Sequence, residues 1–334
     1  MISILGVLII SRVFKYPLDL ISFFESLWLL TFLAGYFNHL PNTIRLYGKA
    51  ALSVKRVAKF LSEQEHEEFI QSASIEEEPL SGRVFPKKII FDQVSFKYPN
   101  GKKAIENLSI DMDLSKKIAI IGEVGSGKTT FLKLLCGELA PSEGQIRIEF
   151  EGGQCRNLWT RPTYNQYRDS IAYVPQEPFV SNDFLSMNIA LTSGHHESEI
   201  IDAAYWAELE ADISALPQGI SQELGESGVN LSGGQRQRLN LARARFSKRK
   251  YLVLDDTLSA LDTKTEASLM KRLESQELGF VLVTHRTGEL MRVGEVVVMK
   301  EGKIVERGQP KILSDNPDSH FTRVLQTYQE ESIQ

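Results

Sequence analysis

The sequence predicts an α/β fold with a mainly parallel sheet, preceded by an apolar helical segment. Three observations predict it: β-rich runs alternate with helical runs from about residue 88 onward, a Gly-rich loop lies between an apolar strand and a helix, and residues 1–40 are strongly apolar. Strands that alternate with helices form parallel sheets whose two faces are covered by helices.

Length and composition exclude several classes of protein. The 334 residues allow two domains, or one large domain with an appendage. Lys and Arg total 38 against 43 acidic residues, so the net charge of −5 offers no basic field, and we predict no nucleic-acid partner. Cys136 and Cys155 cannot build a disulfide framework, and no Cys/His cluster has the spacing of a zinc site. A reducing, cytosolic setting fits this composition.

The first element is the apolar run 18–40, which is about long enough to cross a bilayer as a helix, and we predict that it does so. A signal peptide fits less well, because no small-residue cleavage site follows the run. A buried core helix is the alternative, because Asp19, Glu25 and Asn38 interrupt the run. Lys and Arg residues over 49–59 follow it, and such residues accumulate on the cytoplasmic side of a span. The rest of the chain is therefore expected in the cytoplasm.

Three segments are predicted along the chain. Residues 1–62 are the remnant of a transmembrane domain, in which apolar side chains at helical spacing continue the span over 42–62. Residues 63–87 are acidic and contain Pro, Ser and Gly, so they form a linker by composition. Residues 88–334 form the α/β domain.

The α/β domain is predicted from runs of apolar and β-branched residues that alternate with helical patterns. The predicted strands are 88–98, 116–122, 145–150, 169–175, 250–256, 279–285 and 295–308. The predicted helices lie near 128–137, 198–209, 235–247 and 264–275.

The loop between 116–122 and 128–137 reads Gly-Glu-Val-Gly-Ser-Gly-Lys-Thr and matches the pattern G-x-x-x-x-G-K-[ST]. Backbone N–H groups of such a loop surround phosphates, Lys128 supplies charge to the β and γ oxygens, and the Thr129 hydroxyl can bind Mg²⁺. A purely structural Gly-rich turn is the alternative, and the strand–loop–helix context argues against it. The predicted nucleotide-binding residues here are Gly122, Gly125, Ser126, Gly127, Lys128, Thr129 and Thr130.

The strand 250–256 ends in two aspartates. Mg²⁺ needs a hard oxygen ligand fixed near the phosphates, and we predict that Asp255 supplies it. This signal is weak alone, because many strands end in Asp at a turn. Its pairing with a phosphate loop about 130 residues earlier makes it strong.

Between the two motifs lies Leu231-Ser232-Gly233-Gly234-Gln235, followed by a basic helical stretch. Here the sequence resembles the ATP-binding-cassette (ABC) transporter family, whose defining signature is LSGGQ leading into a basic helix. A Ser N-cap on an ordinary helix is the alternative, but it predicts none of the other family motifs. The resemblance implies that Ser232, Gly233, Gly234 and Gln235 bind a nucleotide held by an opposite cassette.

The remaining family motifs follow in the family's order. By resemblance, Tyr98 stacks on adenine, Gln176 contacts Mg²⁺ and the membrane domain, and His285 contacts the γ-phosphate. The loop 259–262 resembles one that crosses the dimer interface, and 225–228 resembles one that touches the membrane domain in exporters. The resemblance implies ATP and Mg²⁺ as cofactors. The metal ligands that it implies are Thr129, Gln176 and Asp255, and the catalytic residues are Asp256, His285 and Gln176.

The resemblance covers about 88–325 and implies the P-loop NTPase fold of an ABC cassette. That fold has a mainly parallel sheet with helices, an antiparallel β part and a helical subdomain that carries the signature. The sequences of residues 223–244 and 254–262 resemble those of exporters, especially of the multidrug-resistance-associated (C-type) subfamily. The family's membrane domain has six helices, so a chain with one full span looks like the carboxyl-terminal part of a transporter half.

Asp256 stands where, by resemblance, active cassettes usually carry a glutamate that polarises the attacking water. Aspartate is one methylene shorter, and a misplacement of about 1 Å in a catalytic group can lower the rate about a hundredfold. Slow hydrolysis at this chain's own site is therefore predicted. A tolerated variant with a repositioned water is the alternative.

These motifs together predict an ATPase that powers export across a membrane, with a second, non-identical cassette and transmembrane domains as partners. The full transporter is expected to be a multi-pass membrane protein with its cassette in the cytoplasm. Two alternatives stay open: a regulatory ATP-binding module that clamps a dimer without hydrolysis, and a soluble cassette protein of DNA repair or translation.

Overall fold

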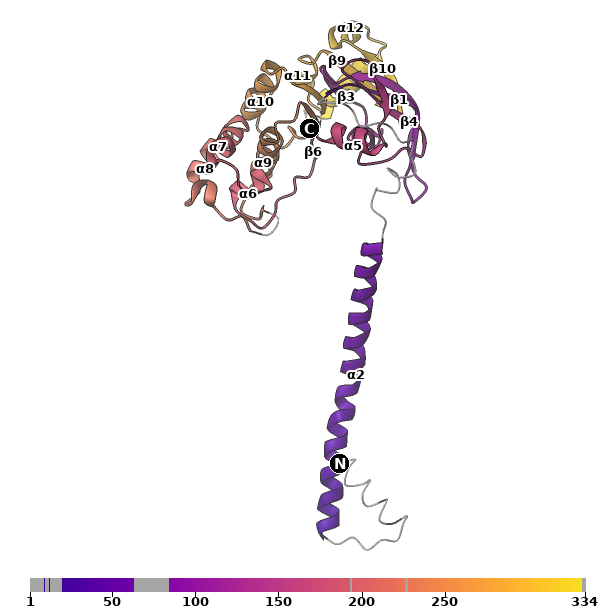
Figure 1. Cartoon of the computed structure of the whole chain (residues 1–334), viewed down its shortest axis with the longest axis vertical. Coiled ribbons are helices and arrows are strands. Elements are labelled where there is room, and N and C mark those ends of the chain that lie inside the picture. The colour runs from indigo at the N-terminus through magenta and orange to yellow at the C-terminus, as the bar shows by residue number, and fades with distance from the viewer. Residues whose placement is uncertain are drawn as a thin grey trace. The chain divides into compact units, whose positions relative to one another are not determined.

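The structure is a computed structural model, and it describes residues 9, 12, 20–62, 84–192, 194–225 and 228–331. The chain divides into two compact units, residues 1–68 and 69–334. Figure 1 labels many of the elements of the two units, and each unit is described by itself.

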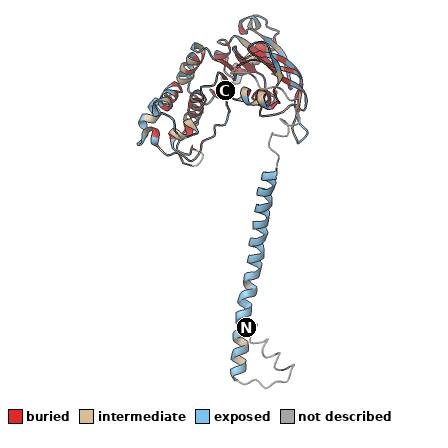
Figure 2. Ribbon diagram, viewed as in Figure 1, coloured by how far each residue is buried: buried red, intermediate tan, exposed pale blue. Residues whose placement is uncertain are grey.

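The first unit contains the 43-residue helix α2 (Leu20–Ser62). Its side chains are exposed along most of its length (Figure 2), including the stacked rings of Trp28 and Phe32, whose centroids are 5.4 Å apart. Hydroxyl side chains within it bond back to the preceding turn; Ser26, for example, donates to the carbonyl oxygen of Ser22 at 2.7 Å.

Within the residues that the structure describes, no helix is both long enough and apolar enough to cross a bilayer. The span predicted at 18–40, of which residues 18 and 19 lie outside the described part, is therefore not confirmed. Glu25, Ser26 and Thr31 lie inside this run and reduce its apolar character. Most of the predicted linker, 63–83, also lies outside the described residues.

The second unit is built on two sheets, and the larger one is mainly parallel, as the sequence predicts. Its strand order is β10-β9-β3-β8-β7-β6, and only β10 runs antiparallel to its neighbour. The bounds are β3 (Lys117–Ile121), β6 (Ile171–Val174), β7 (Tyr251–Asp255), β8 (Gly279–Val283), β9 (Glu295–Lys300) and β10 (Lys303–Gly308). Every residue of β7 and β8 is buried, because a parallel sheet is covered on both faces.

The smaller sheet is antiparallel, with the order β2-β1-β4-β5. Its strands are β1 (Pro86–Lys97), β2 (Lys103–Asp113), β4 (Glu143–Phe150) and β5 (Cys155–Asn157). The structure thus contains the antiparallel β part that the family resemblance implies.

The helices of the second unit fall into a group beside the sheets and a group near the signature. The first group is α4 (Lys128–Leu135), α5 (Arg161–Arg168), α11 (Thr287–Leu290), α12 (Pro310–Ser314) and α13 (His320–Glu331). The second is α6 (Leu185–Ala190), α7 (Glu197–Trp206), α8 (Glu210–Ala215), the 3₁₀ turn η1 (Gly219–Ser221), α9 (Gly233–Phe246) and α10 (Thr263–Ser275). Figure 1 labels α5, α11 and α12 of the first group and α6 to α10 of the second.

Two hydrophobic cores lie on opposite faces of the larger sheet. Alternate residues of a strand point to opposite faces, so Ile118 and Ile120 pack in the core shared with the smaller sheet and α4. Ala119 and Ile121 pack in the core shared with the signature helices and α13. The phosphate loop that follows β3 is therefore anchored by a strand held from both sides.

The core between the two sheets should carry a large part of the stability. Phe131 is fully buried there, and its ring lies 5.0 Å from that of Phe91. We expect Phe131→Ala to lower the free energy of unfolding by about 3–5 kcal/mol, because it leaves a cavity. The matched control is Phe179→Ala, whose side chain is 66% exposed and should cost less than about 0.5 kcal/mol. Urea unfolding followed by tryptophan fluorescence measures both, and equal losses would contradict this assignment of the core.

Candidate nucleotide-binding site

A cavity of about 350 Å³ lies at the carboxyl ends of β7 and β8, beside the first turn of α4. Ligands of parallel α/β sheets bind at this edge, because the loops that follow the strands converge there. The predicted site residues that line the cavity are Tyr98, Gly125, Gly127, Lys128, Thr129, Thr130, Gln176, Asp255, Asp256 and His285. The structure thus brings residues from five separate predicted motifs into one hollow.

The loop from Gly122 to Thr129 is shaped by backbone packing that only glycine permits. Gly122 has φ 149°, and a Cβ atom there would lie 2.1 Å from the carbonyl oxygen of Met299. Gly127 has φ 100° and caps α4, and a Cβ atom there would lie 2.6 Å from the carbonyl oxygen of Ala104. The loop therefore presents backbone N–H groups, rather than side chains, at the positive end of the helix dipole.

Lys128 is buried at the first position of α4, and its ammonium donates to the carbonyl oxygens of Gly122 at 2.7 Å and Glu123 at 2.9 Å. Burial lowers the pKa of Lys128, while the charges of Asp256 and Asp255 oppose this shift. The amine thus folds back over the loop and can turn to phosphate oxygens, which are stronger acceptors.

One predicted residue of the loop lies behind the cavity. The Ser126 side-chain oxygen is buried and has no hydrogen-bond partner among the described residues. Ser126 does not line the cavity, and its hydroxyl lies on the side of Gly122 that faces Met299. Buried hydroxyls almost always have a partner, so a water bound behind the loop would suit this one.

The candidate magnesium residues lie together on the other wall. Thr129 donates its hydroxyl to the carboxylate of Asp255 at 3.4 Å, and Tyr173 donates to the second oxygen of that carboxylate at 3.1 Å. Burial raises the pKa of Asp255, and these two hydrogen bonds act against the shift. Across the described ranges, no three His, Cys, Asp or Glu side chains gather closely enough to hold a metal. One carboxylate and one hydroxyl fit Mg²⁺ that takes its other ligands from phosphates and water.

Asp256 is fixed at both ends of its backbone. Its N–H donates to the carbonyl oxygen of Val283 at 3.1 Å, and its carbonyl oxygen accepts from the Ser259 hydroxyl at 2.8 Å. Its φ of 48° lies in the left-handed region, where Asp is among the few tolerated non-glycine residues. Gln176 donates to its carboxylate at 3.3 Å, and burial raises the pKa of Asp256 despite the nearby His285.

Tyr98 closes the cavity on the side of the smaller sheet. Its hydroxyl is hydrogen-bonded to Thr130 at 3.0 Å, and its ring makes an edge contact with Phe96 at 4.9 Å. The ring is therefore held beside the first turn of α4, where a base could stack on it.

The predicted signature residues lie apart from this cavity, at the start of α9. Ser232 accepts a hydrogen bond from the backbone of Gln235 at 3.2 Å, and Gln235 accepts one from the backbone of Ser232 at 2.7 Å. This capping box is extended by Asp212 of α8, which accepts from Gln235 at 2.8 Å and pairs with Arg238 at 2.6 Å. Gly233 and Gly234 follow Ser232 in the first turn, while Glu226 and Ser227 lie outside the described residues.

Three contacts around the site were not anticipated from the sequence. Tyr173 binds Asp255, Asp212 holds the signature, and Tyr328 lies against His285 with a ring separation of 4.9 Å. No local motif marks any of them. Only the position of Tyr173 in β6, next to β7, offered a signal, because neighbouring strands in a parallel sheet end together.

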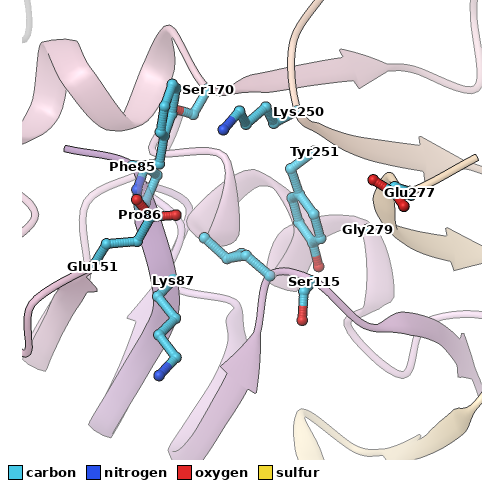
Figure 3. A pocket seen from close by; sticks show the side chains of 11 residues that line it. Phe85, Pro86, Lys87, Ser115, Glu151, Ser170, Lys250, Tyr251, Glu277 and Gly279 are labelled. Atoms are coloured by element: carbon cyan, nitrogen blue, oxygen red, sulfur yellow. The ribbon is translucent and has the colours of Figure 1, made fainter. Parts of the chain in front are cut away.

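A second cavity of about 260 Å³ lies at the opposite edge of the larger sheet, where β7 and β8 begin (Figure 3). Its lining includes Tyr251, whose hydroxyl is buried without a hydrogen-bond partner in the described parts of the chain. Burial raises the pKa of Tyr251, so this phenol stays neutral. The ammonium of Lys250 lies over the Phe85 ring. None of the predicted site residues lines this cavity.

Comparisons with known proteins show that the chain belongs to the ABC transporter family. The ABC transporter family profile matches residues 105–259. The pediocin PA-1 transport/processing ATP-binding protein PedD of Pediococcus acidilactici is 35% identical over 302 residues, 88% of this chain and 40% of that protein. ABC transporter C family member 8 of Dictyostelium discoideum is 28% identical over 86% of this chain and 17% of that protein. The chain thus spans less than half the length of these relatives.

A solved structure of a bacterial Atm1-family ABC exporter with ATP bound is also similar. Its TM-score is 0.68 at 25% identity, and the similarity covers 91% of this chain and 52% of that chain. This structural neighbour is an exporter, and membership of the C-type subfamily remains a prediction for this chain.

We expect Lys128→Ala to weaken MgATP binding about 10- to 100-fold, because hydrogen bonds to charged groups contribute roughly 1.5–3 kcal/mol. Lys103→Ala is the matched control, since Lys103 lines the same cavity but is paired with Glu106 at 3.9 Å. That variant should change the affinity little. Titration of the purified chain with a fluorescent ATP analogue measures both, and equal affinities for Lys128→Ala and the wild type would contradict the assignment.

Proposed function

Because residues 105–259 belong to the ABC transporter family, we propose that this chain is the nucleotide-binding part of an exporter whose ATP hydrolysis drives transport across a membrane. The observation that carries the proposal is the single cavity in which the phosphate loop, Asp255, Asp256, Gln176 and His285 meet. The chain spans only part of its relatives, so export by the whole protein is proposed from its cassette.

Different residues of the cavity would bind the phosphates, the base and the Mg²⁺ ion of MgATP. The backbone N–H groups of the loop and Lys128 would hold the β- and γ-phosphates, and Tyr98 would stack on the base. Thr129, Asp255 and Gln176 would hold Mg²⁺, which neutralises phosphate charge when bound. His285 lines the same cavity as Asp256 and would donate to the γ-phosphate.

We propose that hydrolysis at this chain's own site is slow because Asp256 is too short. Its carboxylate would accept a proton from the attacking water, which requires hydrogen-bond reach. The backbone of Asp256 is tied at Val283 and Ser259, so a shift of the main chain cannot make up for the missing methylene. A displacement of about 1 Å in such a group can cost about a hundredfold in rate.

The short side chain of Asp256 also leads us to propose that the partner cassette is not identical to this one. The signature of this chain is held in one conformation by Ser232, Gln235 and Asp212, and would complete a site on a second cassette. If that cassette carries a glutamate at the position of Asp256, it supplies the active site of the pair. Exposed Phe179 and Val229, near Gln176 and the signature, would face the membrane domains.

Asp256 also favours the second candidate function, which is a regulatory module that clamps a dimer around ATP without hydrolysis. Asp256 weakens hydrolysis and leaves the groups that bind phosphate in place. The two candidates differ in one measurable quantity, the ATP turnover of the assembled protein.

We expect Asp256→Glu to raise the ATP turnover of the full chain by about 10- to 100-fold, with little change in MgATP affinity. Asp256→Asn is the matched control: it keeps the size of the side chain and removes its charge, so residual turnover should fall. Phosphate release and nucleotide titration measure the two quantities. Brisk turnover by the wild type, with no gain from the glutamate, would show that the short side chain is tolerated.

We expect α2 to hold the full chain at a membrane, because many large apolar side chains on it are exposed. Membranes washed with alkaline carbonate should retain the protein, whereas a variant that starts at residue 84 should be released. Complete release of the full chain would contradict membrane attachment and would favour a soluble cassette protein.

A further inference from the structure

The carboxyl-terminal helix α13 makes a contact with the nucleotide site that the family motifs do not include. Its buried face is formed by Phe321, Val324, Leu325 and Tyr328, which recur at the spacing of one helix side and pack in the core behind the larger sheet. Phe321 is fully buried and Tyr328 is 5% exposed. The helix is therefore docked along its whole apolar stripe, and Tyr328 has a fixed position.

The Tyr328 hydroxyl makes two hydrogen bonds with the first residue of the phosphate loop, which lies 206 residues earlier. It donates to the carbonyl oxygen of Gly122 at 3.0 Å and accepts from the N–H of Gly122 at 3.2 Å. Both bonds are buried, and a buried backbone group that loses its partner is costly. The hydroxyl thus fixes the residue where the chain leaves β3 and enters the loop.

The same carbonyl oxygen of Gly122 also accepts from the ammonium of Lys128 at 2.7 Å. When Lys128 turns to a phosphate, this oxygen loses one of its two donors. Tyr328 supplies the other, so the carbonyl stays satisfied and the loop keeps its shape in both positions of the lysine.

The ring of Tyr328 contacts a second element of the site. Its centroid lies 4.9 Å from that of His285, with an angle of 57° between the ring planes. One side chain therefore joins the start of the phosphate loop to the histidine at the end of the neighbouring strand β8. These two elements line the same cavity.

We propose that Tyr328 is a positioning residue of the nucleotide site, which makes α13 a part of that site. It acts on the nucleotide through Gly122 and His285 and touches no phosphate itself. The proposal rests on the proposed ATP binding by the cassette. It adds that the affinity for the nucleotide depends on α13, although α13 does not line the nucleotide cavity.

The test compares two tyrosines that each donate a hydroxyl to a backbone carbonyl. Tyr328→Phe removes only the hydroxyl at Gly122. Tyr167→Phe is the matched control, because Tyr167 is fully buried and its hydroxyl donates to the carbonyl oxygen of Leu135, at the far end of α4, at 2.8 Å. Both variants of the full chain are measured for melting temperature and for affinity toward a fluorescent ATP analogue with Mg²⁺.

Both variants should melt at a lower temperature than the wild type, because Tyr328→Phe loses two buried hydrogen bonds and Tyr167→Phe loses one. Only Tyr328→Phe should also bind MgATP more weakly, by about 3- to 10-fold. Equal nucleotide affinity for Tyr328→Phe and the wild type, measured well below the melting temperature, would overturn the proposal. A wild-type chain that fails to bind MgATP would contradict the cassette function as well.

A measurement on the wild type keeps the proposal testable if Tyr328→Phe does not fold. Hydrogen–deuterium exchange of the amides in 320–331 should slow when MgATP is added, because the helix and the loop are joined at Gly122. Slower exchange in the phosphate loop alone, with no change in α13, would overturn the proposal.

Discussion

The nucleotide site depends on backbone packed directly against backbone around the phosphate loop. Gly122 lies against the carbonyl of Met299, and Gly127 lies against the carbonyl of Ala104, at separations that leave no room for a Cβ atom. The N–H of Gly302 donates to the carbonyl oxygen of Ser126 at 2.9 Å. Strand β2, strand β9 and the turn between β9 and β10 therefore hold the loop from behind.

The charges of the site are buried together, which explains why each of them can be buried at all. Lys128 and Asp255 are buried and Asp256 is half-buried, and burial shifts the pKa of each side chain in the direction that favours its neutral form. A lone buried charge would be far more costly than this cluster of opposite signs. The cluster also contains the groups that would meet the phosphates and Mg²⁺, so binding replaces one set of charge interactions with another.

The parts of the site that were predictable from the sequence are those that a short motif fixes. The spacing from Gly122 to Thr129 dictates a loop before a helix, and Asp255 follows an apolar strand; both lie in the cavity. Tyr328 was not predictable, because a contact across 206 residues leaves no local pattern. Strand β2 was not predicted either. Its buried residues recur at irregular intervals among polar ones, so it has no continuous apolar run of the kind that marked the other strands.

The capping box at the start of α9 bears on how firmly two cassettes can associate. The side chains of Ser232 and Gln235 each accept a hydrogen bond from the backbone N–H of the other residue. The Gln235 side chain also donates to Asp212 of α8. Side chains ordered in this way lose their rotational freedom during folding, so little more is lost when a partner docks. The signature is thus a preorganised surface, so a second cassette that docks on it, as proposed above, would lose less free energy to the ordering of these side chains.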